Sequence, residues 1–241
     1  WLLEIGDQRV LVDPWLCGSL VFPPGPWFFQ GELSQPQPVP QQLDLLLLSQ
    51  GLPDHTHPPS LARLPKQLPV VASPTAARRA QQLGFQQVQA LAPGERWQQG
   101  ALCIRATAGA PVPQVENGYV LEHPAGSLYL EPHGYLPANL PAQRLDAVIS
   151  PVVDLGLPLA GAFVRGQQVL PALLERFQPR TVLASSAGRD VQYSGLLSRI
   201  LWQRGSAEEA AAQVAAVGQG WATDQRCRLI DPEPGLRYAL T

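Results

Sequence analysis

The chain has 241 residues and a formal net charge of −2, with 45% hydrophobic and 15% charged residues. This length favours a single domain over residues 1–241, and the hydrophobic fraction predicts a core that buries both faces of a sheet. Nucleic acids and anionic membranes are excluded as expected partners, because their binders carry clustered basic residues. No apolar run reaches the roughly 20 residues of a membrane span. We therefore expect a soluble protein whose partner is a small-molecule substrate or ligand.

The three cysteines, Cys17, Cys103 and Cys227, are odd in number, far apart and form no C-x-x-C pair. This pattern predicts neither a disulfide framework nor a thiolate zinc site, and it favours a reducing, cytoplasmic compartment. The sequence contains no Met and opens at Trp1 inside a strand-like run. It therefore does not decide whether a targeting segment precedes Trp1.

The first predicted element is a β-hairpin formed by residues 1–5 and 10–12. Residues 17–42 are rich in Pro and Gly and predict a long loop without regular elements. Its large aromatics either roof an apolar pocket or pack the loop down. Residues 43–49 predict a fully buried strand, and the Pro pair at 58–59 predicts a short helix after it.

The rest of the chain mixes strands and helices. Ser73 caps a predicted helix that follows a strand at 70–72 and ends at Gly84. Further strands are predicted at 101–106, 118–122, 128–131, 147–150, 181–185, 227–230 and 236–240. Further helices are predicted at 168–177, 190–204 and from a capping box at Ser206 to Gly218.

The loop from Ser49 to His57 holds the most distinctive chemistry. It leaves the end of a buried strand, where a rigid scaffold presents functional groups, and it contains Asp54, His55 and His57. A carboxylate beside two imidazoles is a ligand set for zinc, or else for manganese or iron. One divalent metal ion is therefore the expected cofactor, with no metal as the alternative.

A second group of polar residues follows another predicted strand. His133 comes after Glu131 and Pro132 and is a candidate third imidazole, because strand ends at one sheet edge converge; the alternative is a turn histidine. Glu131 is a candidate general base if it is partly removed from water, whereas solvent exposure is the ordinary state of a strand end.

These segments together resemble the metallo-β-lactamase superfamily, and in particular its lactonase-like branch. The resemblance implies an α/β fold, the four-layered αββα sandwich, with the site at one edge where the two sheets meet. It rests on four segments: Val12-Asp13-Pro14-Trp15, Leu47 to His55, Ala106 to Gly109 before Gly118 to Leu121, and Leu128 to His133.

In that family the loop reads Thr-His-x-His-x-Asp-His and binds two metal ions. The corresponding positions here are Gln50, Leu52, Asp54 and His55, and the third histidine of the first site would fall near Ala110. The resemblance therefore implies that the first site is lost, since Leu and Ala offer no lone pair. Gln50 either contacts a substrate or fills the vacated space as a structural amide.

The second site of the family is better retained. Its bridging aspartate falls at His133, and its final histidine is replaced near Ser185 or Ser186. The resemblance thus implies a degenerate, mononuclear site of Asp54, His55 and His133. It also implies that Asp13 supports the loop through hydrogen bonds. His57 is a substitute ligand if the loop is distorted.

In the family, metal acidifies a water that attacks an ester, lactone, thioester or phosphodiester. The resemblance therefore implies a metal-dependent hydrolase of a small ester, lactone or phosphoester, with Asp54 and Glu131 as candidate catalytic carboxylates. The alternative is a catalytically inactive member that binds a ligand or a protein partner. Fold alone does not choose between them.

Overall fold

The computed structural model describes residues 1–111, 115–185, 191–221 and 226–240. Contacts divide the chain into two compact units. The first comprises Trp1–Ala106 and Arg189–Ile200, and the second Thr107–Gly188 and Leu201–Thr241. The single domain expected from the length stays a prediction.

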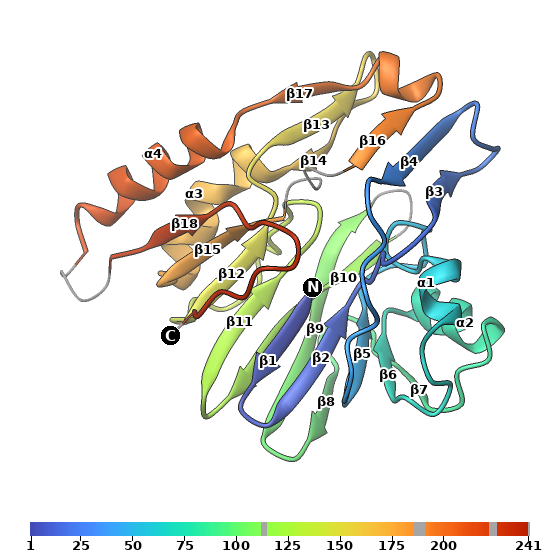
Figure 1. Cartoon of the computed structure of the whole chain (residues 1–241). Helices are drawn as coiled ribbons and strands as arrows, with labels where there is room; N and C mark the ends of the chain where they lie inside the picture. Colours follow the sequence, from blue (N-terminus) through green and yellow to red (C-terminus); the bar gives the residue numbers. More distant parts are fainter. Residues whose placement is uncertain (112–114, 186–190, 222–225, 241) are drawn as a thin grey trace. The chain divides into compact units, whose positions relative to one another are not determined.

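The first unit is built on a five-stranded sheet in the order β1-β2-β5-β6-β7 (Figure 1). The hairpin β1–β2 is antiparallel, as its sequence predicts, and β2, β5, β6 and β7 pair in parallel. The elements are β1 (Leu2–Ile5), β2 (Gln8–Val12), β3 (Ser19–Phe22), β4 (Phe29–Leu33), β5 (Leu45–Leu48), α1 (Pro58–Ala62), β6 (Val70–Ala72), α2 (Pro74–Gln82), β7 (Val88–Ala90), β8 (Arg96–Gln99), β16 (Val191–Ser194) and the 3-10 helix η1 (Leu197–Arg199).

Strand β5 forms the centre of this unit, because all four of its leucines are fully buried. Helices α1 and α2 cover the sheet beside β6 and β7 (Figure 1), and Leu46, Leu48 and Leu61 share a core cluster. Helix α2 begins where the sequence predicts, since the Ser73 hydroxyl accepts a hydrogen bond from Ala76 N at 3.3 Å. The buried β5 thus carries the loop that starts at Ser49.

The predicted long loop at 17–42 is wrong in part. It contains β3 and β4, which form a three-stranded sheet in the order β16-β4-β3. The prolines that suggested a loop lie at 23, 24 and 26, in the turn between β3 and β4. Proline has no backbone N–H, and because none lies within these two strands, their N–H groups can pair. Phe29 stacks on Tyr193 with ring centroids 5.5 Å apart, whereas Trp27 is 65% exposed.

The second unit contains most of a seven-stranded sheet in the order β18-β15-β12-β11-β10-β9-β8, whose β9 passes from the first unit into the second. Strands β10 and β11 pair antiparallel, as predicted, and β11, β12, β15 and β18 are parallel. The elements are β9 (Leu102–Pro111), β10 (Val115–His123), β11 (Gly126–Leu130), β12 (Ala147–Ser150), β13 (Asp154–Leu157), β14 (Gly161–Arg165), α3 (Gly166–Phe177), β15 (Thr181–Ala184), β17 (Trp202–Arg204), α4 (Ala207–Gly218) and β18 (Arg228–Ile230).

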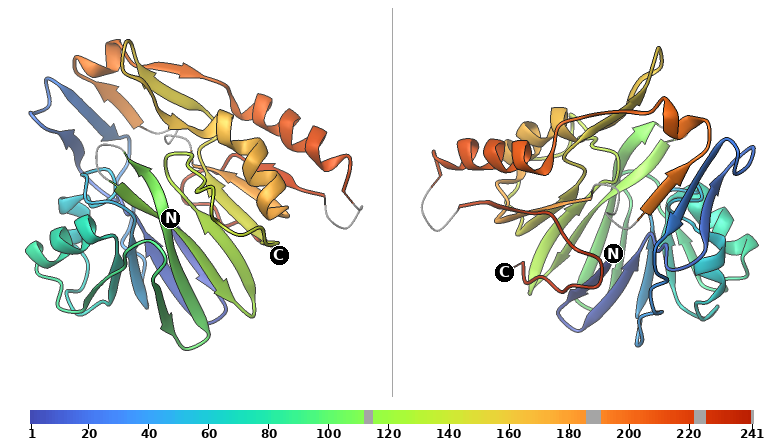
Figure 2. Two further views of the ribbon diagram at one scale, coloured as in Figure 1. Left: turned by 180° about the vertical axis from the view of Figure 1, so that it is seen from behind. Right: turned by 45° about the horizontal axis from the view of Figure 1, so that its top comes forward.

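Helices α3 and α4 lie side by side in this unit (Figure 2). Leu170 and Leu174 of α3 share a cluster with Val214 of α4, and Phe177 packs on Tyr129 of β11 with ring centroids 4.9 Å apart. The N-cap predicted at Ser206 forms, since its hydroxyl accepts from Glu209 N at 3.2 Å, whereas Glu209 Oε2 accepts from Gln167 Nε2 at 3.0 Å. The helices therefore fix the strand ends from which the polar loops leave.

Two predicted elements of the C-terminal part are wrong. The helix expected over 190–204 is replaced by β16, η1 and β17, because Gly195, at φ 99°, breaks the run and Val191–Ser194 pairs with β4. Arg189 and Asp190 lie outside the described residues. The strand expected at 236–240 does not form, and prolines at 232 and 234 separate it from β18.

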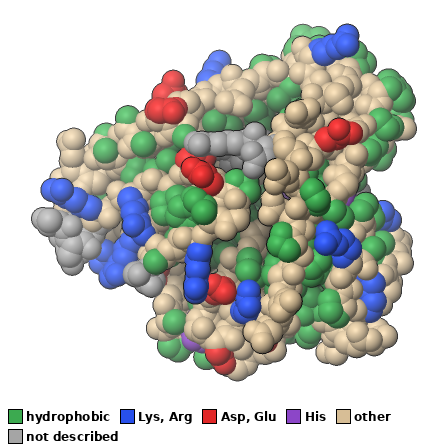
Figure 3. Space-filling view, viewed as in Figure 1, with side chains coloured by type: hydrophobic (Ala, Val, Ile, Leu, Met, Phe, Trp, Pro, Cys, Tyr) green, Lys and Arg blue, Asp and Glu red, His purple; other side chains and the backbone are tan. Residues whose placement is uncertain are grey.

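None of the described helices is long and apolar enough to cross a membrane. On the face drawn in Figure 3, acidic side chains are scattered among apolar ones, whereas several basic side chains lie near one another at the left of the view.

Candidate metal centre

The polar site of the first unit begins where two parallel strands end. Asp13 follows β2 and Ser49 follows β5, and the two strands pair in parallel up to Val12 and Leu47. Parallel strands bring their carboxyl ends to one edge of a sheet, so these polar side chains meet. One Asp13 carboxylate oxygen, Oδ1, accepts from Ser49 N at 2.8 Å, and the other, Oδ2, accepts from the Ser49 hydroxyl.

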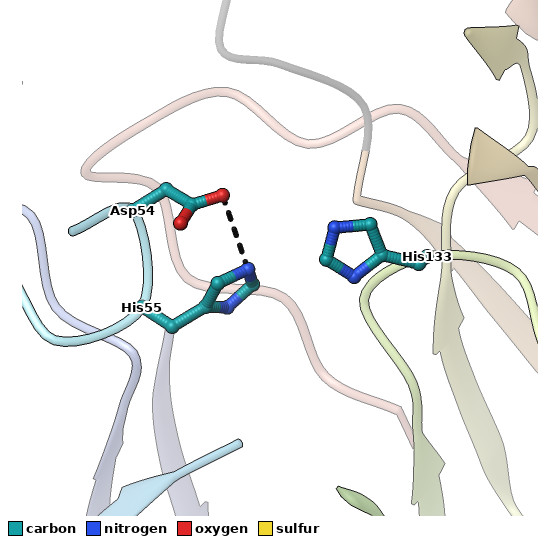
Figure 4. A group of neighbouring side chains, drawn as sticks. All are labelled: Asp54, His55 and His133. Atoms are coloured by element: carbon teal, nitrogen blue, oxygen red, sulfur yellow. Dashed lines mark ion pairs between the residues drawn. The ribbon is translucent and has the colours of Figure 1, made fainter. Parts of the chain in front are cut away.

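His55 enters this group from a tight turn, in which its backbone N donates to Leu52 O at 3.0 Å. Its Nδ1 lies 2.9 Å from Asp13 Oδ2 and 3.1 Å from the Ser49 hydroxyl. Its Nε2 lies 3.2 Å from Asp54 Oδ2, the contact marked in Figure 4. His55 is only 7% exposed, so its ring is held between two carboxylates away from bulk water.

The charge state of His55 follows from these neighbours. Burial opposes protonation, but the negative charges of Asp54 and Asp13 outweigh it and hold the pKa of His55 well above its usual value. In the absence of a metal ion the ring is therefore an imidazolium that donates to Asp13 from Nδ1 and forms an ion pair with Asp54 at Nε2. A metal ion at Nε2 would take the place of one proton.

The spacing of Asp54 and His55 fits a metal ion. Two bonds of about 2.0–2.1 Å at a tetrahedral angle place their ligand atoms roughly 3.3 Å apart. The Asp54 Oδ2 to His55 Nε2 distance is 3.2 Å. Asp13 holds Nδ1 on the far side of the ring, which is the arrangement that fixes the orientation of metal-ligating histidines. The first unit thus supplies two ligands and the group that orients one of them.

His57 has a different environment. It precedes α1, and its Nδ1 accepts from Ser60 N at 3.3 Å and lies 2.9 Å from the Ser60 hydroxyl. Its Nε2 lies 3.1 Å from Ser19 O, to which it donates. Burial lowers the pKa of His57. Both ring nitrogens are engaged in caps and turns, so this geometry favours a structural role, and ligation by His57 stays a prediction.

The polar group of the second unit comprises Glu116, Glu131 and His133. Glu116 lies near the start of β10, and Glu131 directly follows β11. His133 Nδ1 is 2.8 Å from Glu116 Oε1. Figure 4 shows the His133 ring on the loop that leaves β11, near the start of that loop. Backbone N–H groups of His133 and Tyr135 donate to Glu131 Oε2 at 3.1 and 2.6 Å.

Glu131 is not the exposed carboxylate that is ordinary at a strand end, because it is fully buried, as is Glu116. Burial raises the pKa of Glu131 to about 8, and the charge of Glu116 adds to the increase. Atoms of Glu116, Glu131 and His133 that can bind a metal all lie within 4.8 Å of one another. The second unit therefore brings two carboxylates and one imidazole together.

Neither an imidazole nor a carboxylate is present at the remaining ligand positions of the family, which fall at Gln50, Leu52 and Ala110 for the first site and at Ser185 or Ser186 for the second. Ala110 is a buried apolar residue of β9, and Leu52 lies in the turn before His55. The Gln50 side chain is buried. Ser185 directly follows β15, and Ser186 lies outside the described residues.

Sequence reasoning missed Glu116. The available signal is a Glu-Asn pair at 116–117 shortly before the apolar run Tyr119–Leu121, a position where a charged side chain is expected only if it has a partner. Asp154 lies in β13 with its side chain buried, where it accepts from Gln168.

Comparison with known proteins identifies the family. Residues 1–186 match the model of the beta-lactamase superfamily domain. The chain belongs to this family. No curated protein matches its sequence.

Solved structures share the fold at low sequence identity. Isothiocyanate hydrolase from Delia radicum gut bacteria is 17% identical, with a TM-score of 0.60, covering 77% of this chain and 80% of that one. A possible metal-dependent hydrolase from Veillonella parvula is 14% identical, with a TM-score of 0.65 and coverages of 98% and 94%. A metallo hydrolase from Ignicoccus hospitalis is 16% identical, with a TM-score of 0.57 and coverages of 98% and 91%. The predicted α/β metallo-β-lactamase fold is confirmed.

Proposed function

We propose that this protein is a metal-dependent hydrolase that acts on an ester, lactone or phosphoester bond of a small molecule through a single metal ion. The observation that supports it most is the group in the first unit. His55 is held by Asp13 at Nδ1 and faces Asp54 at Nε2, at the spacing of two ligands on one ion. His133, the third ligand expected from the sequence, stays a prediction.

Some residues of the first unit would bind such an ion, and others would orient its ligands. Asp54 and His55 would bind it, and a divalent ion so bound would supply acidification of a water molecule to a pKa near 7. Asp13 keeps the Nδ1 proton of His55 in place and so leaves the Nε2 lone pair for ligation. Ser49 fixes Asp13 through both its backbone N–H and its hydroxyl. The buried position of His55 limits competition from bulk water.

The experiment measures hydrolysis by the full chain of three simple reporters: p-nitrophenyl acetate, a γ-lactone and bis-p-nitrophenyl phosphate. Zinc and manganese are each supplied after chelator treatment. We expect metal-dependent hydrolysis of at least one reporter, and its loss in His55→Ala. The matched control is His123→Ala, because His123 lies in the β10–β11 turn, where it accepts from Ala125 N.

Hydrolysis that persists after chelation and in His55→Ala would overturn the proposal. Metal binding at His55 without hydrolysis of any reporter class would instead support the alternative of an inactive member that binds a ligand.

A further inference from the structure

We propose that the second unit contains a divalent-cation site of its own, formed by Glu116, Glu131 and His133. The metal-binding atoms of these three side chains lie within 4.8 Å of one another. The set needs no residue of the first unit, so it goes beyond the single ion of the proposed hydrolase.

Strand pairing brings the three residues together. Strands β10 and β11 pair antiparallel, with Tyr119 opposite Leu130. Glu116 lies three residues before Tyr119 and Glu131 one residue after Leu130, so both carboxylates lie at the same end of this strand pair. The His133 carbonyl accepts from Arg165 N at 2.9 Å, and the His133 N–H donates to Glu131. The backbone therefore fixes the imidazole beside both carboxylates.

The donor atoms indicate the class of ion. Two carboxylate oxygens and one imidazole nitrogen suit a divalent first-row ion such as zinc, manganese or iron, and they lack the thiolates that softer ions prefer. The Glu116 to His133 separation of 2.8 Å is about half an ångström shorter than that of two ligands at a tetrahedral ion. A small opening of this contact would admit the ion.

Charge supplies a second argument. Glu116 and Glu131 are both fully buried, and His133 is 9% exposed. Two acidic side chains and one imidazole therefore share a buried place, and charge placed there is costly unless it is compensated. A divalent cation would compensate both carboxylates while the imidazole binds in its neutral form.

The strands also make room for these particular side chains. A Cβ atom at Gly109 of β9 would lie 2.6 Å from Glu116 Cγ, and one at Gly118 of β10 would lie 3.2 Å from Glu131 Cγ. Neither glycine has a positive φ angle, so the backbone conformation does not require glycine there. The space left by the missing Cβ atom explains the glycine at each position. The two glycines therefore leave room for the side chains of Glu116 and Glu131.

The test uses the full chain with Asp54→Ala and His55→Ala, which removes the two ligands proposed in the first unit. Zinc per chain is measured by equilibrium dialysis and elemental analysis. We expect this protein to retain one zinc ion and to lose it when Glu131→Gln or Glu116→Gln is added. Glu122→Gln is the matched control, because it removes a carboxylate of the same strand outside the cluster and should leave the ion bound.

The two proposals fail in different ways. If the Asp54→Ala, His55→Ala protein binds one zinc ion fewer than the wild type, the lost ion was bound in the first unit. If an ion remains and is lost when Glu116 or Glu131 is replaced, that ion was bound in the second unit. Absence of zinc from the Asp54→Ala, His55→Ala protein would overturn the second site and leave a proton shared among the three side chains. Zinc retained after Glu131→Gln and Glu116→Gln would overturn it equally.

Folding of each variant is checked by circular dichroism and by thermal unfolding in the presence of a chelator. Gln has nearly the shape of Glu and removes one repelling charge, so we expect the metal-free variants to remain folded. In the Asp54→Ala, His55→Ala background, zinc should raise the melting temperature. Glu131→Gln and Glu116→Gln should each abolish this increase, and a full increase in both would contradict the site.

Discussion

Asp13→Asn tests whether the orientation of His55 depends on a carboxylate. Asp13 has a φ angle of 41°, a conformation that Asn tolerates far better than most residues. The substitution therefore keeps the size and the backbone of the wild type. It replaces one carboxylate oxygen by an amide donor, in a place where every neighbouring group is itself a donor.

The effect on metal affinity follows from the hydrogen bonds. If the amide nitrogen takes the place of Oδ2, it faces His55 Nδ1, and the ring must accept there and move its proton to Nε2. If the amide takes the opposite orientation, its nitrogen faces the Ser49 N–H instead. Loss of an outer partner of a metal-ligating histidine lowers affinity by about 10- to 100-fold, which corresponds to roughly 1.4–2.7 kcal/mol.

Stability should fall as well. One orientation of the amide forces His55 into its other tautomer, and the other leaves the amide nitrogen facing the Ser49 N–H; an unsatisfied buried group costs about 1–3 kcal/mol. Urea unfolding of the chelator-treated protein measures this cost, and chelator competition with zinc measures the affinity. Asp44→Asn is the matched control, because Asp44 accepts from Arg9 N at 2.8 Å in the same unit and contacts no histidine.

The reasoning would be refuted by an Asp13→Asn protein that binds zinc within about threefold of the wild type, when the expected loss is at least tenfold. A loss of affinity of equal size in Asp44→Asn would show that the effect comes from reduced negative charge and not from the orientation of His55.

Three further outcomes can be checked directly. Gly109→Ala should lower the free energy of unfolding by about 1–3 kcal/mol, because its Cβ would meet Glu116 Cγ at 2.6 Å; a thermal melt unchanged from the wild type would contradict this. His57→Ala should lower stability through its lost contacts with Ser60 and leave zinc per chain unchanged, and loss of an ion would restore His57 as a ligand. Burial raises the pKa of Cys227 to about 12, so iodoacetamide at pH 8 should alkylate it far more slowly in the folded protein than in urea, as followed by peptide mass spectrometry.

The fold was predictable where local signals and burial agree. The four leucines of β5 form an apolar run of strand length, and Ser73-Pro74 is a strong start signal for a helix; both elements lie where the sequence predicts. Residues 191–204 show the opposite case. Their strand β16 exists because it pairs with β4, more than 150 positions earlier, and no local pattern encodes a partner at that distance.

The residues of the candidate site also divide into those that the sequence indicates and those that only the structure reveals. Asp54, His55 and His133 stand out by residue type and spacing, and so they were identified from the sequence. Glu116 was not, because a single glutamate in a strand gives no sign of what it faces until the register places it beside His133. The burial of Glu131 could not be predicted either, because the sequence shows only that this residue follows a strand.

Burial of polar groups bears on the choice between a working site and an inactive one. A protein that needed only its fold would gain or lose little by placing well-packed apolar residues at buried ionisable positions, and such exchanges are often stabilising. Ala110 is a buried apolar residue of this kind. His55, Glu116 and Glu131, by contrast, are polar and at most 7% exposed, and each needs several precisely placed partners to offset its desolvation. Packing alone gives no reason for this cost, whereas the cation binding that we propose would supply one.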